Sequence, residues 1–118
     1  MIMSDILQKQ IEFTKCVGQL IEYAYNRGYA LTIGDGYRDP RVFGELGKKL
    51  GYGRAKSCHK LRLAIDLNLF VDGEWISDGD HPAWIDLSNK WESLHPLARS
   101  GLRFDDANHF SFLHEGLT

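Results

Sequence analysis

The stretch from Ser57 to Val71, SCHKLRLAIDLNLFV, decides the fold because it holds the strongest strand signal in the chain. Its second part, from Leu63 onward, is a nearly continuous apolar run of the kind that forms a buried strand. One carboxylate, Asp66, interrupts this run, and a histidine, His59, stands seven residues before it. A partly buried ionised carboxylate is costly unless it is paired or binds a cation. The stretch therefore predicts a strand that carries a functional group.

Two strands of the sequence are predicted to have one apolar and one polar face, because successive side chains of a strand point to opposite sides. In the first strand Ile65, Leu67, Leu69 and Val71 share one face, and Ala64, Asp66, Asn68 and Phe70 share the other. In the last strand, His109 and Ser111 share a face opposite Phe110 and Phe112. Each strand thus offers a potential metal ligand on its polar side.

The elements around these strands indicate a mixture of helices and hairpin-type strands. Before the central strand, the sequence predicts a helix capped by Ser4 and ending near Arg27, a strand over Tyr29–Ile33, a loop over Gly34–Gly36, and a helix from Asp39 and Pro40 to about Leu50. Directly after the central strand it predicts a hairpin turn at Asp72 and Gly73 and a short returning strand over Glu74–Ile76. A helix opened by Asp80 and Pro82 and a last strand over His109–Phe112 complete the predicted elements. Segment 54–60 is predicted to be a loop, and Trp84 and Trp91 are predicted to lie in the core. The fold class is therefore α+β: a small single domain over residues 1–118, with helices packed on an antiparallel sheet.

Composition narrows the classes of function. The chain has 118 residues and a net charge of −2, which gives no electrostatic reason to expect nucleic acid or an anionic membrane as partner. No apolar run approaches the roughly 20 residues that span a bilayer. The first ten residues lack a secretory signal, and Cys16 and Cys58 are far apart, so we expect synthesis in a reducing cytoplasm without a disulfide. We also expect a monomer.

Three residues make up a plausible metal-binding set. His59, Asp66 and His109 supply two imidazoles and one carboxylate, which is a ligand set of catalytic zinc sites that leave the fourth position to water. His59 and Asp66 are seven residues apart, and an odd separation would place them on opposite faces of a regular strand. His59 is therefore expected in the preceding loop or beyond a bulge. The alternative is a polar cluster in which Asp66 pairs with Arg62 or Lys60 and His109 is half exposed.

Three separated segments resemble one family of enzymes. The pattern S-x-H-x-x-x-x-A-x-D at 57–66, followed by D-x-x-H at 106–109, resembles the zinc peptidases that cut bacterial cell-wall peptides. These include D-alanyl-D-alanine carboxypeptidases and dipeptidases, and the L-alanyl-D-glutamate endopeptidases used as phage endolysins. GDGYRDP at 34–40 is similar to the family's Gly-x-Arg segment. The resemblance covers most of the chain and implies the fold that these peptidases share with hedgehog signalling domains.

The resemblance also implies roles for individual residues. His59, Asp66 and His109 match the zinc ligands, and Asp106 matches the catalytic base. Arg38 matches the arginine that faces the substrate carbonyl or carboxylate. Ser57 matches a serine that contacts the substrate or supports a ligand. The chain departs from the pattern it resembles at Arg99-Ser100-Gly101, where family members of similar style often have Trp-Gly-Gly, and segment 41–52 is less typical.

Each of these roles has a plainer alternative. Asp106 can be a turn residue, Arg38 a surface charge, and Ser57 the cap of a turn. Cys58 is a potential competing thiolate ligand, but we expect it to point away from His59. Three other histidines are interpreted as structural: His81 at a helix entry, His95 at a helix exit, and His114, which is close enough in sequence to His109 to line the same cleft. A ligating histidine should donate its other N–H to an acceptor such as Asp105, Asp35 or a backbone oxygen.

The expected function is zinc-dependent hydrolysis of an amide bond in the peptide stem of peptidoglycan. An L-alanyl-D-glutamate endopeptidase is the first choice, because those endolysins carry Asp where other members carry Glu. The alternatives are a D-alanyl-D-alanine carboxypeptidase, a non-catalytic module that binds zinc or wall peptides, and a cytosolic dipeptidase. Asp106 and Arg38 favour an enzyme, since a binding module needs no base. A phage protein made in the host cytoplasm would reach the wall after release through a separate pore.

Overall fold

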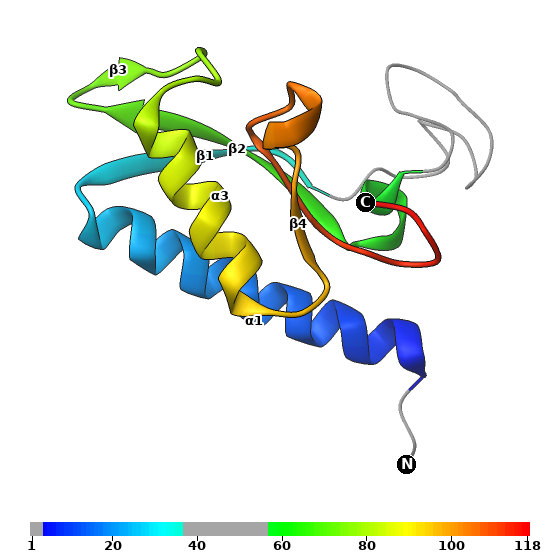
Figure 1. Cartoon of the computed structure of the whole chain (residues 1–118). Helices are drawn as coiled ribbons and strands as arrows, with labels where there is room; N and C mark the ends of the chain where they lie inside the picture. Colours follow the sequence, from blue (N-terminus) through cyan, green and yellow to red (C-terminus); the bar gives the residue numbers. More distant parts are fainter. Residues whose placement is uncertain (1–3, 37–56) are drawn as a thin grey trace.

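An antiparallel sheet forms around the strand that the sequence singles out. The computed structural model describes residues 4–36 and 57–118. In this part of the chain the sheet has five strands, namely β1 (Tyr29–Asp35), β2 (Ala64–Val71), β3 (Glu74–Trp75), β4 (Ala98–Ser100) and β5 (His109–Phe112). Their order is β1-β2-β5-β4, and β3 pairs with the outer end of β2. β2 is thus central, with β1 on one side and β5 on the other (Figure 1).

Two α-helices of the described residues pack on this sheet, which confirms the α+β class. Helix α1 (Asp5–Asn26) begins where predicted, since the Ser4 hydroxyl accepts a hydrogen bond from the Leu7 N–H at 3.2 Å. It ends before Gly28, whose φ of 85° is the left-handed conformation of a helix stop. Helix α3 (Pro82–Leu94) is capped by His81 rather than Asp80, because Nδ1 of His81 accepts the Ala83 N–H. The predicted helix over 39–50 lies outside the described residues.

The hairpin between β2 and β3 follows from its two turn residues. Asp72 and Gly73 have φ values of 53° and 79°, the positive pair that a tight type I′ turn requires. The returning strand stops at Trp75, one residue earlier than predicted. The predicted turn is therefore confirmed.

The helices cover the apolar face of the sheet (Figure 1). Most of the fully buried side chains of this core come from both helices and from the strand faces predicted to be apolar, among them Leu20, Leu67, Leu69, Leu87, Trp91, Phe110 and Phe112. Trp91 makes edge-on contacts with Phe13 and Phe110, at ring-centroid distances of 5.6 and 5.8 Å. Because side chains alternate along a strand, Asp66 and His109 point to the opposite face.

Three short elements differ from the sequence prediction. β4 was not predicted, because it is only three residues long and has no alternation to detect. Cys58–Leu61 forms a 3₁₀ turn, η1, within and just after the segment predicted to be a loop, and Leu102–Phe104 forms another, η2. Such single turns are defined by local hydrogen bonds rather than by an apolar period.

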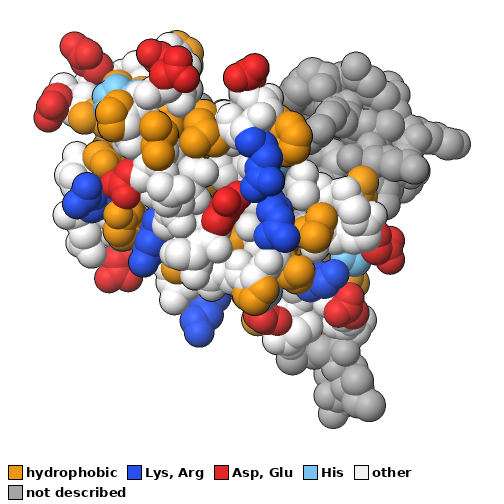
Figure 2. Space-filling model, in the orientation of Figure 1, with side chains coloured by type: hydrophobic (Ala, Val, Ile, Leu, Met, Phe, Trp, Pro, Cys, Tyr) orange, Lys and Arg blue, Asp and Glu red, His pale blue; other side chains and the backbone are white. Residues whose placement is uncertain are grey.

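The described surface carries charges of both signs (Figure 2), and both cysteines lie in the interior. Figure 2 shows both acidic and basic side chains on the described part of this face, with a short column of basic ones near its middle. Among the described residues, no helix combines the length and the apolar character that crossing a bilayer requires. Cys16 and Cys58 are both buried free thiols.

Candidate metal centre

The centre begins with two residues that pair across the sheet. Asp66 of β2 lies directly opposite His109 of β5 in the antiparallel register. Directly opposed residues share one face, so both side chains emerge on the side away from the helices. Nδ1 of His109 lies 3.2 Å from Oδ1 of Asp66.

The third residue, His59, comes from the η1 turn. The Ser57 hydroxyl caps this turn by accepting the His59 N–H at 3.2 Å, and Arg62 ends it in the left-handed conformation with φ of 58°. The chain then enters β2, and Nε2 of His59 lies 3.3 Å from Oδ1 of Asp66. The parity argument is therefore confirmed: His59 precedes the strand instead of belonging to it.

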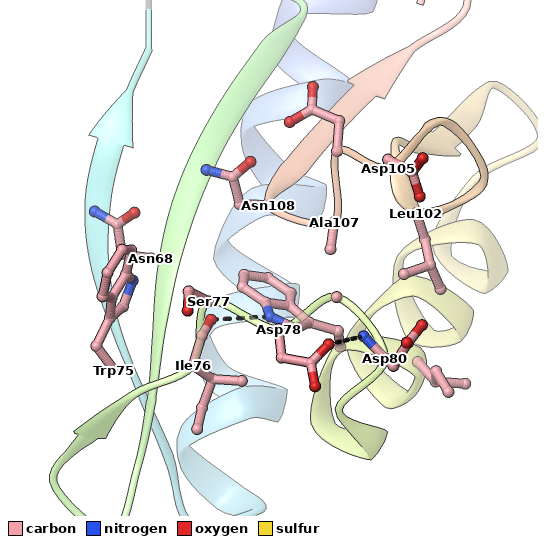
Figure 3. Close-up of a pocket in the computed structure, with 14 residues that line it drawn as sticks. Asn68, Trp75, Ile76, Ser77, Asp78, Asp80, Leu102, Asp105, Ala107 and Asn108 are labelled. Atoms are coloured by element: carbon pink, nitrogen blue, oxygen red, sulfur yellow. Dashed lines mark hydrogen bonds between the residues drawn. The ribbon is translucent and has the colours of Figure 1, made fainter.

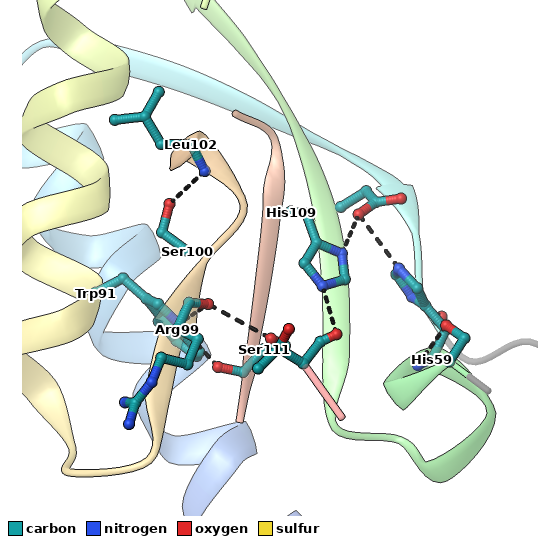
Figure 4. A network of polar contacts seen from close by, with 11 residues as sticks. His59, Trp91, Arg99, Ser100, Leu102, His109 and Ser111 are labelled. Atoms are coloured by element: carbon teal, nitrogen blue, oxygen red, sulfur yellow. Dashed lines mark hydrogen bonds and ion pairs between the residues drawn. The ribbon is translucent and has the colours of Figure 1, made fainter. Parts of the chain in front are cut away.

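The three side chains converge on one point. One ligand atom from each of His59, Asp66 and His109 lies within 4.8 Å of the other two. Figure 4 shows both imidazoles turned toward the same carboxylate. His59 is 1% and His109 5% exposed, so the alternative in which His109 is half exposed is wrong.

The outer nitrogens of both imidazoles face main-chain oxygens. Nδ1 of His59 lies 2.7 Å from the Gly36 oxygen, and Nε2 of His109 lies 3.2 Å from the Thr118 oxygen. A carbonyl oxygen only accepts, so each of these nitrogens donates. Of the acceptors considered from the sequence, backbone oxygens are the ones used. Metal-binding histidines are commonly oriented by such contacts.

The inner nitrogens fit a cation. A neutral imidazole has one N–H, so donation to Gly36 and Thr118 leaves lone pairs on the nitrogens that face Asp66. Among the described residues, Nε2 of His59 has no hydrogen-bond partner although it is buried. Two lone pairs and a carboxylate that point at one another repel, and a bound cation would relieve this repulsion.

The carboxylate is held in its ionised form. In the metal-free centre burial raises the pKa of Asp66, but hydrogen bonds from His109 and His59, with the hydrogens on the nitrogens that face the carboxylate, more than offset this effect and hold the pKa well below its usual range. When the imidazoles instead donate outward, a bound cation would take the place of these hydrogens. A deprotonated carboxylate is the form that binds a metal. The set of two nitrogens and one oxygen suits zinc with an open position, and also other divalent ions.

Asp106, the predicted base, lies beside this centre. It is exposed and, together with His109, lines a cavity of about 330 Å³. It also lines a second cavity of about 570 Å³ between β2, the β3–α3 segment and the loop before β5. Figure 3 shows Asn68 and Trp75 together at one edge of this larger cavity, with Asn108 and Ala107 away from them. Asp106 thus lines both cavities.

The remaining predicted residues have different positions. Ser57 is buried and caps η1, so it supports the turn that carries His59. Arg38 lies outside the described residues. The Cys58 thiol contacts the main-chain oxygen of Phe112 at 3.6 Å, in agreement with the expectation that it points away from His59. His114 is not among the residues that line the smaller cavity, and its Nδ1 accepts from Lys9.

Gly101 is a residue of the site that sequence reasoning missed. Its N–H donates to the His109 oxygen at 2.8 Å, and its own oxygen accepts from the Asp106 N–H at 3.0 Å. The Asp106 oxygen in turn accepts the His109 N–H at 3.0 Å. Gly101 therefore fixes the base and one ligand together.

Replacing Gly101 with alanine should damage the centre. A Cβ here would lie 2.3 Å from the Asp106 oxygen and 2.9 Å from the His109 Cβ, so the main chain must shift. We expect Gly101→Ala to lower the free energy of unfolding by about 1–3 kcal/mol and to weaken zinc binding. Urea unfolding and titration against a competing chelator measure these effects.

The matched control is Gly18→Ala on the exposed side of α1, where a Cβ meets nothing within 4 Å. There the same substitution should stabilise the protein by about 0.5–1 kcal/mol. Equal effects at the two positions would contradict the close approach at Gly101.

Comparison with protein-family models finds no match for this sequence, and comparison with curated proteins finds none either. The metal centre therefore rests on its own geometry.

Proposed function

We propose that this protein is a zinc-dependent peptidase that hydrolyses an amide bond in the peptide stem of peptidoglycan, with L-alanyl-D-glutamate endopeptidase as the first assignment. The observation that carries the proposal is the convergence of His59, Asp66 and His109, together with a cavity that His109 and Asp106 both line. Three protein ligands leave a coordination position open, as catalytic zinc sites do and structural sites do not. When bound, zinc would supply Lewis-acid polarisation of the amide carbonyl and acidification of water.

Asp106 supplies the proton transfer in this proposal. Its carboxylate is solvent-accessible and is not one of the three converging ligands. As a general base it takes the proton of the attacking water and then gives it to the leaving amine. The main-chain bonds of Gly101 and His109 to Asp106 keep this carboxylate at the cavity.

The shape of the site supports a peptide substrate that extends past the cleaved bond. The cavities of about 330 and 570 Å³ are both lined by Asp106, and in this proposal the substrate lies on both sides of the base. A free dipeptide would leave the larger cavity empty, which favours an endopeptidase over a dipeptidase. The resemblance of the 57–66 and 106–109 motifs to cell-wall peptidases supports the substrate class, and in this proposal Arg38 binds the substrate carbonyl or carboxylate.

The alternatives make different demands on the site. A D-alanyl-D-alanine carboxypeptidase needs the same metal set and base but releases a terminal residue. A non-catalytic zinc or wall-peptide module needs no carboxylate beside an open metal position, and Asp106 argues against it. In the proposal the protein acts as a monomer on the wall, after synthesis in the cytoplasm, which is the host's if the protein comes from a phage.

Digestion of purified peptidoglycan tests the proposal. The zinc-loaded protein should release fragments with new L-alanine C-termini and D-glutamate N-termini, detected by mass spectrometry. Asp66→Asn, which keeps the side-chain shape and removes the ligand charge, should release none. Release of free D-alanine instead of these fragments would identify the protein as a carboxypeptidase. No release with zinc demonstrably bound would exclude the peptidase and favour the binding module.

A further inference from the structure

We propose that the turn formed by residues 114–118 positions the metal ligand His109 through the main-chain oxygen of Thr118. This inference rests on the proposed metal site and adds a positioning residue to it. The Thr118 oxygen accepts the Nε2 hydrogen of His109 at 3.2 Å. That bond fixes which nitrogen carries the hydrogen, and it turns Nδ1 toward Asp66.

The conformation of the turn brings Thr118 to this place. His114 and Leu117 exchange two main-chain hydrogen bonds of 2.9 and 2.8 Å. The two residues between them, Glu115 and Gly116, have φ values of 48° and 81°, the positive pair of a type I′ turn. The chain therefore reverses immediately after the strand that carries His109, and the residue after the turn returns to the imidazole.

Contacts on three sides fix the turn to the rest of the molecule. The Leu113 N–H donates to the Leu97 oxygen at 2.8 Å. Lys9 of α1 donates to Nδ1 of His114 at 2.9 Å. Leu117 packs partly buried against the core. Thr118 is thereby held against the cavity wall, where it is one of the lining residues.

The hydrogen bond between His109 and the Thr118 oxygen is expected to affect metal affinity. Outer contacts to metal-binding histidines typically account for about 10–100-fold in metal affinity, because they orient the ring and raise its basicity. Here the acceptor is a main-chain atom, so the side chain of Thr118 is not needed. Removal of the residue and removal of its side chain should therefore have different effects.

Three variants separate positioning from simple packing. A chain that ends at Leu117 lacks the acceptor, and Gly116→Val distorts the turn because valine is strained at φ of 81°. Thr118→Ala keeps the acceptor and is the matched control. Zinc affinity is measured by competition with a chelator, ligand geometry by the visible absorption of the Co²⁺ form, and stability by urea unfolding of the metal-free proteins.

We expect the shortened chain and Gly116→Val to bind zinc about 10–100-fold more weakly than the natural chain, with an altered Co²⁺ spectrum. Thr118→Ala should match the natural chain in both measurements. The inference is overturned if the shortened chain keeps the natural affinity and spectrum, or if it loses only stability. Failure of the natural chain itself to bind zinc or Co²⁺ would instead refute the metal site on which the inference rests.

Discussion

Asp106→Asn is expected to reduce peptide hydrolysis by about 10²–10⁴-fold, the usual contribution of a general base. Asparagine has nearly the same shape but cannot accept and return the proton. The main-chain bonds from Asp106 to Gly101 and His109 do not involve the side chain, so the loop should keep its conformation. Zinc affinity should therefore be preserved. Steady-state kinetics on a defined stem peptide and chelator competition measure the two quantities.

Asp105→Asn is the control for this prediction. Asp105 is the neighbouring carboxylate, but it lines only the larger cavity, whereas Asp106 lines both. Asparagine also tolerates the left-handed conformation of Asp105, whose φ is 57°. We expect Asp105→Asn to retain most of the activity. Similar losses in both variants would mean that the negative charge of the loop matters and that Asp106 is not the base.

Trp91→Ala is expected to remove about 3–5 kcal/mol from the free energy of unfolding. Trp91 is fully buried and packs edge-on against Phe13 and Phe110. Its indole N–H also donates to the Arg99 and Ser111 oxygens, at 3.0 and 3.1 Å, and so links β4 to β5. Truncation leaves a cavity and removes a donor from two inward-facing oxygens. Small domains are stable by only about 5–15 kcal/mol, so this is a large share.

Trp75→Ala provides the comparison, because Trp75 is 63% exposed. The same truncation there should change the unfolding free energy by no more than about 0.5 kcal/mol. Urea unfolding followed by circular dichroism measures both variants. Trp91→Phe, which keeps an aromatic ring, supplies an intermediate value if the alanine variant does not fold. A Trp91→Ala loss no larger than that of Trp75→Ala would contradict the central place of Trp91 in the core.

The sequence by itself determined the features that depend on local chemistry. Ser4 and Gly28 set the ends of α1, and Asp72-Gly73 set the hairpin, because caps and positive-φ turns depend on single residue types. The alternation in 64–71 and 109–112 placed Asp66 and His109 on polar faces. It also required His59 to lie outside the strand. These rules act over a few residues and need no knowledge of the rest of the chain.

Only the tertiary structure decided which of these polar groups meet. The register that places Asp66 opposite His109 joins positions 43 residues apart in the sequence, and no local rule sets such a pairing. Gly101, Gly36 and Thr118 act through main-chain atoms, whose contacts depend on where the chain passes and not on side-chain type. The metal ligands could therefore be predicted from residue types in the sequence, whereas the main-chain atoms that orient them are determined by the tertiary structure.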